Sequence, residues 1–60
     1  MAKLFNIYID TDYDEADYLG SYKAKTMNEA VRAALEDNGY DPEQYDKKTQ
    51  TYNGYKVWNE

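Results

Sequence analysis

Residues 26–39 read TMNEAVRAALEDNG, and this segment predicts the main helix of the chain. Thr26 and Glu29 have the spacing of a capping box, in which each side chain bonds the other's backbone amide. Apolar residues then recur every three or four positions and form one stripe: Met27, Ala30, Val31, Ala34 and Leu35. Gly39 after Asn38 fits a left-handed C-terminal cap. The small alanines let this helix lie close to a sheet with bulky inward side chains.

Two strands are predicted before the helix, at residues 4–9 and 18–25. In the first strand, the two-residue period places one set of apolar side chains on a single face: Phe5, Ile7 and Ile9. The second strand follows the acidic segment 10–17 and pairs back antiparallel, with Tyr18, Tyr22 and Ala24 on one face. Gly20 predicts either a bulge or a point where neighbouring aromatic rings cover bare backbone.

The C-terminal third predicts one short helical turn and a hairpin. Asp41 and Pro42 suit the N-cap and first position of a single turn over residues 41–45. Asn53-Gly54 separates two β-prone runs, so Tyr52 and Tyr55 should face each other across a tight turn. Residues 1–60 are thus predicted to form a single small α+β domain. Its antiparallel sheet of about four strands, in the order β-β-α-β-β, has one helix packed across one face.

Composition restricts the function. Twelve acids against seven bases give a net charge of −5, which argues against direct binding of nucleic acid or an anionic membrane and favours a basic partner. Cysteine and histidine are absent from the sequence, so we expect no zinc, no other cofactor and no enzymatic activity. No apolar run approaches the length of a membrane span, and no signal peptide is recognisable, which predicts a cytoplasmic protein.

The segment DTDYDEADY, residues 10–18, concentrates five acids and has three interpretations. A calcium loop would need glycine where Glu15 stands and glutamate where Ser21 stands, so we predict no metal site. Alternate residues of an extended chain lie about 6.6–6.8 Å apart, close to two nucleotide steps of about 3.4 Å, so the acids could imitate phosphates. The third interpretation is a solvated hairpin loop that keeps a tyrosine-rich sheet soluble.

Further acids and tyrosines extend these candidates. Glu36 and Asp37 occupy the last helical turn, where acids oppose the helix dipole, which favours a functional acidic face. Tyr13 and Tyr18 are the tyrosines best placed for the centre of a contact. One face of the predicted sheet has no covering element, and tyrosines on it would form an exposed aromatic surface. Stacking of these rings on single-stranded bases is a further alternative, which the acidic charge disfavours.

In size and composition the chain resembles small acidic inhibitors encoded by bacteriophages and mobile elements, including DNA mimics. The resemblance is one of general character and involves no specific residue. We therefore predict a non-enzymatic protein-binding module that occludes a basic nucleic-acid-binding surface on a host protein. The acids assigned to this contact are Asp10, Asp12, Asp14, Glu15, Asp17, Glu36 and Asp37, with Tyr13 and Tyr18 as its aromatic centre. The alternative is a structural or self-associating subunit, such as a homodimer, whose tyrosine-rich sheet face forms the interface.

Overall fold

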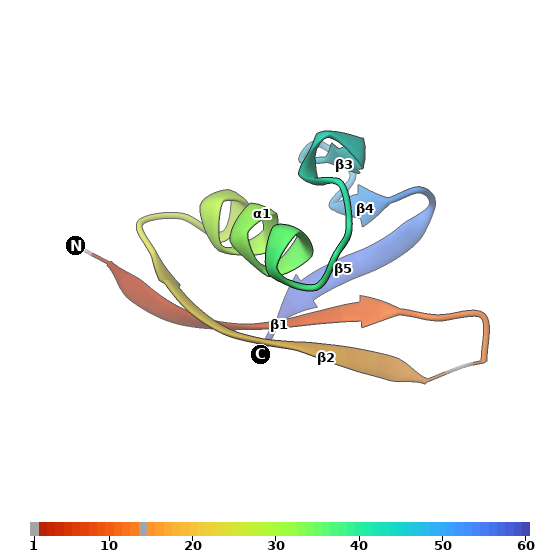
Figure 1. Cartoon of the computed structure of the whole chain (residues 1–60), viewed down its shortest axis with the longest axis horizontal. Coiled ribbons are helices and arrows are strands. Elements are labelled where there is room, and N and C mark those ends of the chain that lie inside the picture. Colours follow the sequence, from red (N-terminus) through yellow and green to blue (C-terminus); the bar gives the residue numbers. More distant parts are fainter. Residues whose placement is uncertain (1, 14) are drawn as a thin grey trace.

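The computed structural model describes residues 2–13 and 15–60 and contains an antiparallel sheet with one helix across one face (Figure 1). The order of strands in the sheet is β2-β1-β5-β4-β3. The elements are β1 (Lys3–Asp10), β2 (Ala16–Ala24), α1 (Met27–Asp37), a 3-10 turn η1 (Pro42–Gln44), β3 (Tyr45–Asp46), β4 (Thr51–Tyr52) and β5 (Tyr55–Asn59). The predicted α+β architecture is confirmed, with five strands where about four were expected.

Both ends of α1 carry the predicted caps. At the N-terminus, Thr26 Oγ1 accepts the Glu29 amide at 3.3 Å, while Glu29 accepts the Lys25 amide, one residue before the expected partner. At the C-terminus, the amides of Gly39 and Tyr40 donate to the carbonyls of Glu36 and Leu35, which is the Schellman arrangement. Within residues 2–13 and 15–60, neither α1 nor any other helix is long and apolar enough to cross a membrane.

The core is small and lies between α1 and the sheet. Its buried side chains are Ile7, Ile9, Leu19, Ala30, Val31, Ala34, Leu35 and Val57. Partly buried aromatic residues pack around it: Phe5, Tyr22, Tyr40, Tyr45, Tyr52 and Tyr55. Aromatic rings therefore supply much of the apolar area that so few aliphatic residues cannot provide.

A β-bulge at Leu19 changes the face on which the tyrosines of β2 lie. Ile7 opposes Gly20 and Tyr8 opposes Tyr18, so Leu19 has no counterpart on β1, and its side chain enters the core. Tyr18 consequently lies on the face away from α1, whereas Tyr22 packs on the core. The prediction that Tyr18, Tyr22 and Ala24 share one face is therefore wrong, because one extra residue shifts the two-residue period.

Gly20 fulfils both predicted roles. It borders the bulge with φ of +132°, a conformation that side chains with a Cβ rarely adopt. A Cβ at this position would also lie 3.0 Å from Cε2 of Tyr22, so the ring of Tyr22 covers the bare backbone of the glycine.

The C-terminal hairpin follows the prediction and adds one strand. Asp41 Oδ1 accepts the Glu43 amide at 3.0 Å and so caps η1. Asn53 and Gly54 have φ of 48° and 88°, and Tyr52 pairs with Tyr55 across the turn. The unpredicted strand β3 pairs with β4 over two residues, a length too short to produce a periodic pattern in the sequence.

Candidate functional site

A cleft of about 330 Å³ opens where the connection between β1 and β2 approaches the turn between β4 and β5. We call it the acidic cleft. Four acids line it, namely Asp10, Asp12, Glu15 and Asp17, together with four tyrosines, namely Tyr13, Tyr40, Tyr52 and Tyr55. The remaining wall consists of Ile9, Thr11 and Asn53. Segments that are distant in the chain thus contribute carboxylates and aromatic rings to one concave surface.

Thr11 holds the β1–β2 connection in shape. Its hydroxyl donates to the Glu15 carbonyl at 2.7 Å and accepts the Tyr13 amide at 3.3 Å, while its own amide donates to Asp10. The chain turns at residues 12–13, so it is not extended there. The nucleotide-like spacing predicted for alternate acids therefore does not continue past Asp10.

Tyr55 ties this connection to the other hairpin. Its hydroxyl donates to Asp12 Oδ1 at 2.6 Å, joining residues 43 positions apart in the chain. The pKa of Tyr55 is raised, chiefly by this hydrogen bond and then by the charge of the carboxylate, because a phenolate would lose the bond and face Asp12. Tyr55 therefore stays a donor at neutral pH and fixes one edge of the acidic cleft.

Tyr40 and Tyr52 build the opposite wall. Their rings meet edge to face, with centroids 5.3 Å apart at 71°, and the Tyr52 hydroxyl accepts the Asp41 amide at 3.2 Å. Tyr40 is positioned by the helix cap, since its amide bonds the Leu35 carbonyl. Rings with electron-rich faces next to carboxylates attract cations, and arginine in particular can stack on a ring while bonding a carboxylate with its planar fork. The cleft is thus suited to a guanidinium or ammonium group.

Five of the nine predicted contact residues meet at this cleft: Asp10, Asp12, Tyr13, Glu15 and Asp17. Glu36 and Asp37 do not join them, because they line a separate hollow beside the last turn of α1. Tyr18 lies on the far face of the sheet as a result of the bulge. Asp14 falls outside the described residues.

Asp37 has a local partner that explains its position. Its Oδ2 accepts the Tyr22 hydroxyl at 2.7 Å. Partial burial raises the pKa of Tyr22, and the hydrogen bond to Asp37 adds to the increase. The helix-end position of Asp37 therefore supports packing of Tyr22, and it no longer argues for a separate acidic face.

Three tyrosines of the acidic cleft were not predicted as site residues: Tyr40, Tyr52 and Tyr55. The sequence does show the Tyr52–Tyr55 pair around Asn-Gly and places Tyr40 directly after the helix cap. Neither pattern reveals that the acidic connection lies against these rings, because that contact depends on the packing of β5 beside β1.

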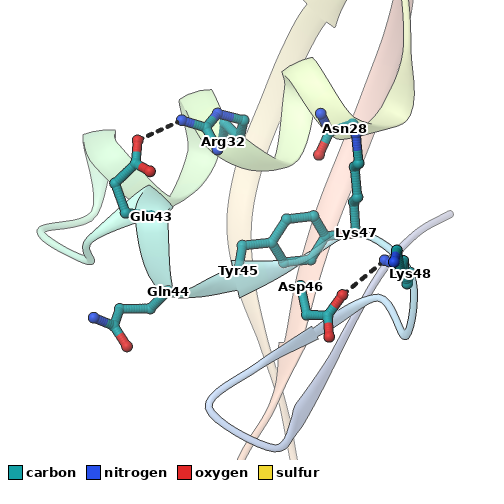
Figure 2. Close-up of a pocket in the computed structure, with 8 residues that line it drawn as sticks. All are labelled: Asn28, Arg32, Glu43, Gln44, Tyr45, Asp46, Lys47 and Lys48. Carbon is teal, nitrogen blue, oxygen red and sulfur yellow. Dashed lines mark hydrogen bonds and ion pairs between the residues drawn. The ribbon is translucent and has the colours of Figure 1, made fainter.

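A larger hollow of about 620 Å³ lies between α1 and β3, with the ring of Tyr45 near its centre (Figure 2). Here side chains of both charges lie together. Arg32 forms an ion pair with Glu43 at 2.9 Å, the only ion pair among residues 2–13 and 15–60, and Asp46 accepts the Lys48 amide at 2.9 Å. Because this hollow is lined by three basic and two acidic residues, whereas the described lining of the acidic cleft carries one sign only, the acidic cleft is the stronger candidate site.

Metal ligation is a separate question for these acids. In the part of the chain that the structure describes, no group of three or more carboxylates could hold a metal ion. Two of the cleft carboxylates have other partners, since Asp12 accepts the Tyr55 hydroxyl and Asp10 accepts the Thr11 amide. Comparison of the chain with protein-family models, with curated proteins and with solved structures finds no match.

Proposed function

We propose that this chain is a non-enzymatic, cytoplasmic protein-binding module whose acidic cleft receives a basic segment of a partner protein. The observation that carries the proposal is the convergence of four acids and four tyrosines on one cleft. An arginine or lysine inserted there would donate charge-assisted hydrogen bonds to the carboxylates and make cation–π contacts with the rings. The tyrosine rings thus add an aromatic surface to the acidic contact that the sequence predicts.

The biological role we propose is occlusion of a basic, nucleic-acid-binding surface on a host protein, as in the small acidic inhibitors of phages and mobile elements. The net charge of −5 would speed encounter with such a surface. Tyr13, 84% exposed beside the acids, would be covered by the partner and slow its dissociation. The acidic charge would therefore raise the association rate constant, and the Tyr13 ring would lower the dissociation rate constant.

Capture of partners from a bacterial lysate tests this role, with two variants of equal net charge. Glu15→Gln with Asp17→Asn removes two charges from the acidic cleft, and neither side chain makes a hydrogen bond within the described residues. Glu36→Gln with Glu60→Gln removes two charges elsewhere. We expect the unmodified protein and the second variant to retain a basic nucleic-acid-handling protein that elutes as salt rises. The cleft variant should lose it. A partner retained equally by both variants would contradict the proposal.

The kinetics of that interaction provide a second test. Glu15→Gln with Asp17→Asn should lower the association rate several-fold at low salt and flatten its salt dependence. Tyr13→Ala should instead raise the dissociation rate about tenfold or more, as loss of a central aromatic contact does. Biolayer interferometry with the captured partner at two salt concentrations measures both rate constants. The reverse pattern would mean that the acids, not the ring, hold the bound state.

A further inference from the structure

The face of the sheet away from α1 carries a second, chemically different surface. Cross-strand pairs alternate between the two faces, so the residues opposite the core pairs share this face, which we call the open face. It consists of Leu4, Asn6 and Tyr8 from β1, Tyr18, Ser21 and Lys23 from β2, and Lys56 and Trp58 from β5. Within residues 2–13 and 15–60, no element packs over it, as Figure 1 shows below the sheet.

Three aromatic rings form a ladder across the open face. Tyr8 lies in the middle, 5.0 Å from Tyr18 and 5.9 Å from Trp58 between ring centroids, and the Trp58 ring is nearly parallel to it. Leu4 and Tyr18 are 60% and 54% exposed. An apolar surface of this kind on a small protein usually marks a contact with another macromolecule.

Three polar side chains of the open face, Asn6, Tyr18 and Ser21, already have partners. The Tyr18 hydroxyl lies 2.6 Å from Ser21 Oγ, and Ser21 in turn donates to Asn6 Oδ1. The Asn6 side-chain amide donates to the Glu60 carbonyl at 2.9 Å. Burial of a polar group is costly only when it loses its hydrogen bonds, so this face can be covered without leaving these groups unpaired. That property suits an apolar, protein-like occupant.

Charge distinguishes between possible occupants. Lys23 and Lys56 lie near the rings, and Asp10 lies at the end of β1. The open face and its border therefore carry a few charges of both signs. A nucleic acid would face the net charge of −5, and a basic partner would be drawn to the acidic cleft instead. A second copy carries the same net charge of −5, but unlike a nucleic acid it also presents lysines, which can lie near Asp10 of the other copy.

The available area also fits a second copy. The molecule measures 35 × 20 × 20 Å, so a face that spans its two longest axes covers at most about 700 Å². Stable interfaces bury about 600–1,000 Å² on each partner. An open face close to this upper bound would therefore suffice for a dimer at the small end of the range. The small core gives such a dimer a physical benefit, because a 60-residue chain buries too little apolar surface to be very stable alone.

We infer that the open face is a self-association interface, in which two copies pack their Tyr18–Tyr8–Trp58 ladders and Leu4 against each other about a two-fold axis. The two sheets form the inner layers and the two α1 helices the outer layers of this dimer. Both acidic clefts remain accessible apart from Asp10 at their edge, since Tyr40, Tyr52 and Tyr55 pack on the side of the core. The inference does not depend on the proposed function.

Sedimentation equilibrium between about 1 µM and 1 mM tests the interface. Leu4→Lys adds a charge at an exposed position of the open face, and Ala33→Lys adds the same charge on the exposed side of α1. We expect dimers of the unmodified chain and of Ala33→Lys, and a dissociation constant raised at least tenfold in Leu4→Lys, with unchanged circular dichroism. A monomer at 1 mM, or equal dissociation constants for the two variants, would overturn the inference.

Two further readouts identify the occupant and separate this inference from the acidic cleft. Trp58 is the only tryptophan, so its emission should shift to the blue with protein concentration as dimers form. Glu15→Gln with Asp17→Asn should dimerise like the unmodified chain. Quenching of Trp58 in a chain that remains monomeric on addition of single-stranded oligothymidylate would instead assign the open face to nucleic acid and overturn the inference.

Discussion

At the scale of single residues, Leu19 and Gly20 determine which side chains reach each face of β2. Leu19 is 8% exposed and has no counterpart on β1, and Gly20 provides the backbone conformation beside it. The carbonyl of Leu19 accepts the Asn38 side chain at 2.9 Å, so the bulge is also bonded to the end of α1. This pair of residues explains why Tyr18 belongs to the open face and Tyr22 to the core.

Substitution of Gly20 tests that explanation. Gly20→Ala should destabilise the protein by about 1–3 kcal/mol, because the backbone conformation is strained for alanine and its Cβ would lie 3.0 Å from the Tyr22 ring. Gly39→Ala is a matched control, since Gly39 also has positive φ, but a Cβ there would meet nothing within 4 Å. It should cost about 1 kcal/mol from backbone strain alone. Urea denaturation measures the loss of unfolding free energy in both variants. Equal losses would mean that contact with the Tyr22 ring is unimportant.

The raised pKa of Tyr55 predicts a dependence of stability on alkaline pH. Because the folded-state pKa lies above the unfolded value near 10, the stabilisation is complete below pH 10 and is lost as the pH rises through the folded-state pKa. Tyr55→Phe should therefore be less stable than the unmodified chain at pH 7 and lose less stability between pH 9 and 11. Asp12→Asn should show the same smaller loss, because it removes the charge that raises the pKa. Urea denaturation across this pH range measures the effect, and parallel curves for all three proteins would contradict it.

At the scale of elements, the sequence predicts the features that depend on neighbouring residues and misses those that depend on pairing between distant segments. The helix, its two caps and the Asn53-Gly54 turn each depend on residues within a few positions of one another, so the sequence predicts them correctly. The bulge depends on how β2 aligns with β1, and β3 depends on its pairing with β4. The acids of the cleft were predicted as one group because they are adjacent in sequence. Three of its four tyrosines were missed because they come from three later segments of the chain.

The N-terminal cap of α1 gives a prediction for the element as a whole. Thr26→Ala should lower the free energy of unfolding by about 0.5–2 kcal/mol, because the Glu29 amide loses its acceptor. Thr26→Ser keeps a hydroxyl in place and should stay within about 0.5 kcal/mol of the unmodified chain. Thermal unfolding followed by circular dichroism at 222 nm compares the three proteins. If serine and alanine were equally destabilising, the methyl group rather than the hydroxyl of Thr26 would matter.

At the scale of the whole molecule, four acids line one cleft whose described lining contains no cation. Arg32–Glu43 is the sole ion pair in the described part of the chain, and it lies in the other hollow. Repulsion among the carboxylates of the cleft is therefore relieved only by solvent, by salt and by the hydrogen bonds from Tyr55 and Thr11. Repulsion of this kind among neighbouring carboxylates reduces the stability of the protein.

This arrangement predicts that salt stabilises the free protein. Raising sodium chloride from 10 mM to 500 mM should increase the melting temperature by several degrees, because the salt screens repulsion between exposed acids. Glu15→Gln with Asp17→Asn should raise the melting temperature at 10 mM and reduce its increase with salt. Glu43→Gln, which breaks the ion pair, should change stability by less than about 1 kcal/mol. A melting temperature independent of salt would show that the acids are too far apart to interact.

The acidic cleft and the open face differ in chemistry and lie on different sides of the sheet. Carboxylates and tyrosines face a cleft on the side of the core, and a ring ladder with paired polar groups covers the open face. A dimer through the open face would carry two acidic clefts on one particle. Against a partner with repeated basic segments, two linked sites bind with an avidity far above that of either alone.

The bulge in β2 also affects how readily the chain aggregates through the edge of its sheet. Strand β2 is the long edge of the sheet, and an uninterrupted edge is a template for the addition of further chains. Leu19 divides it into regular stretches of residues 16–18 and 20–24, both shorter than the six or seven residues that typically nucleate amyloid fibrils. The same irregularity that directs Tyr18 outward therefore protects a tyrosine-rich protein from polymerising along its edge.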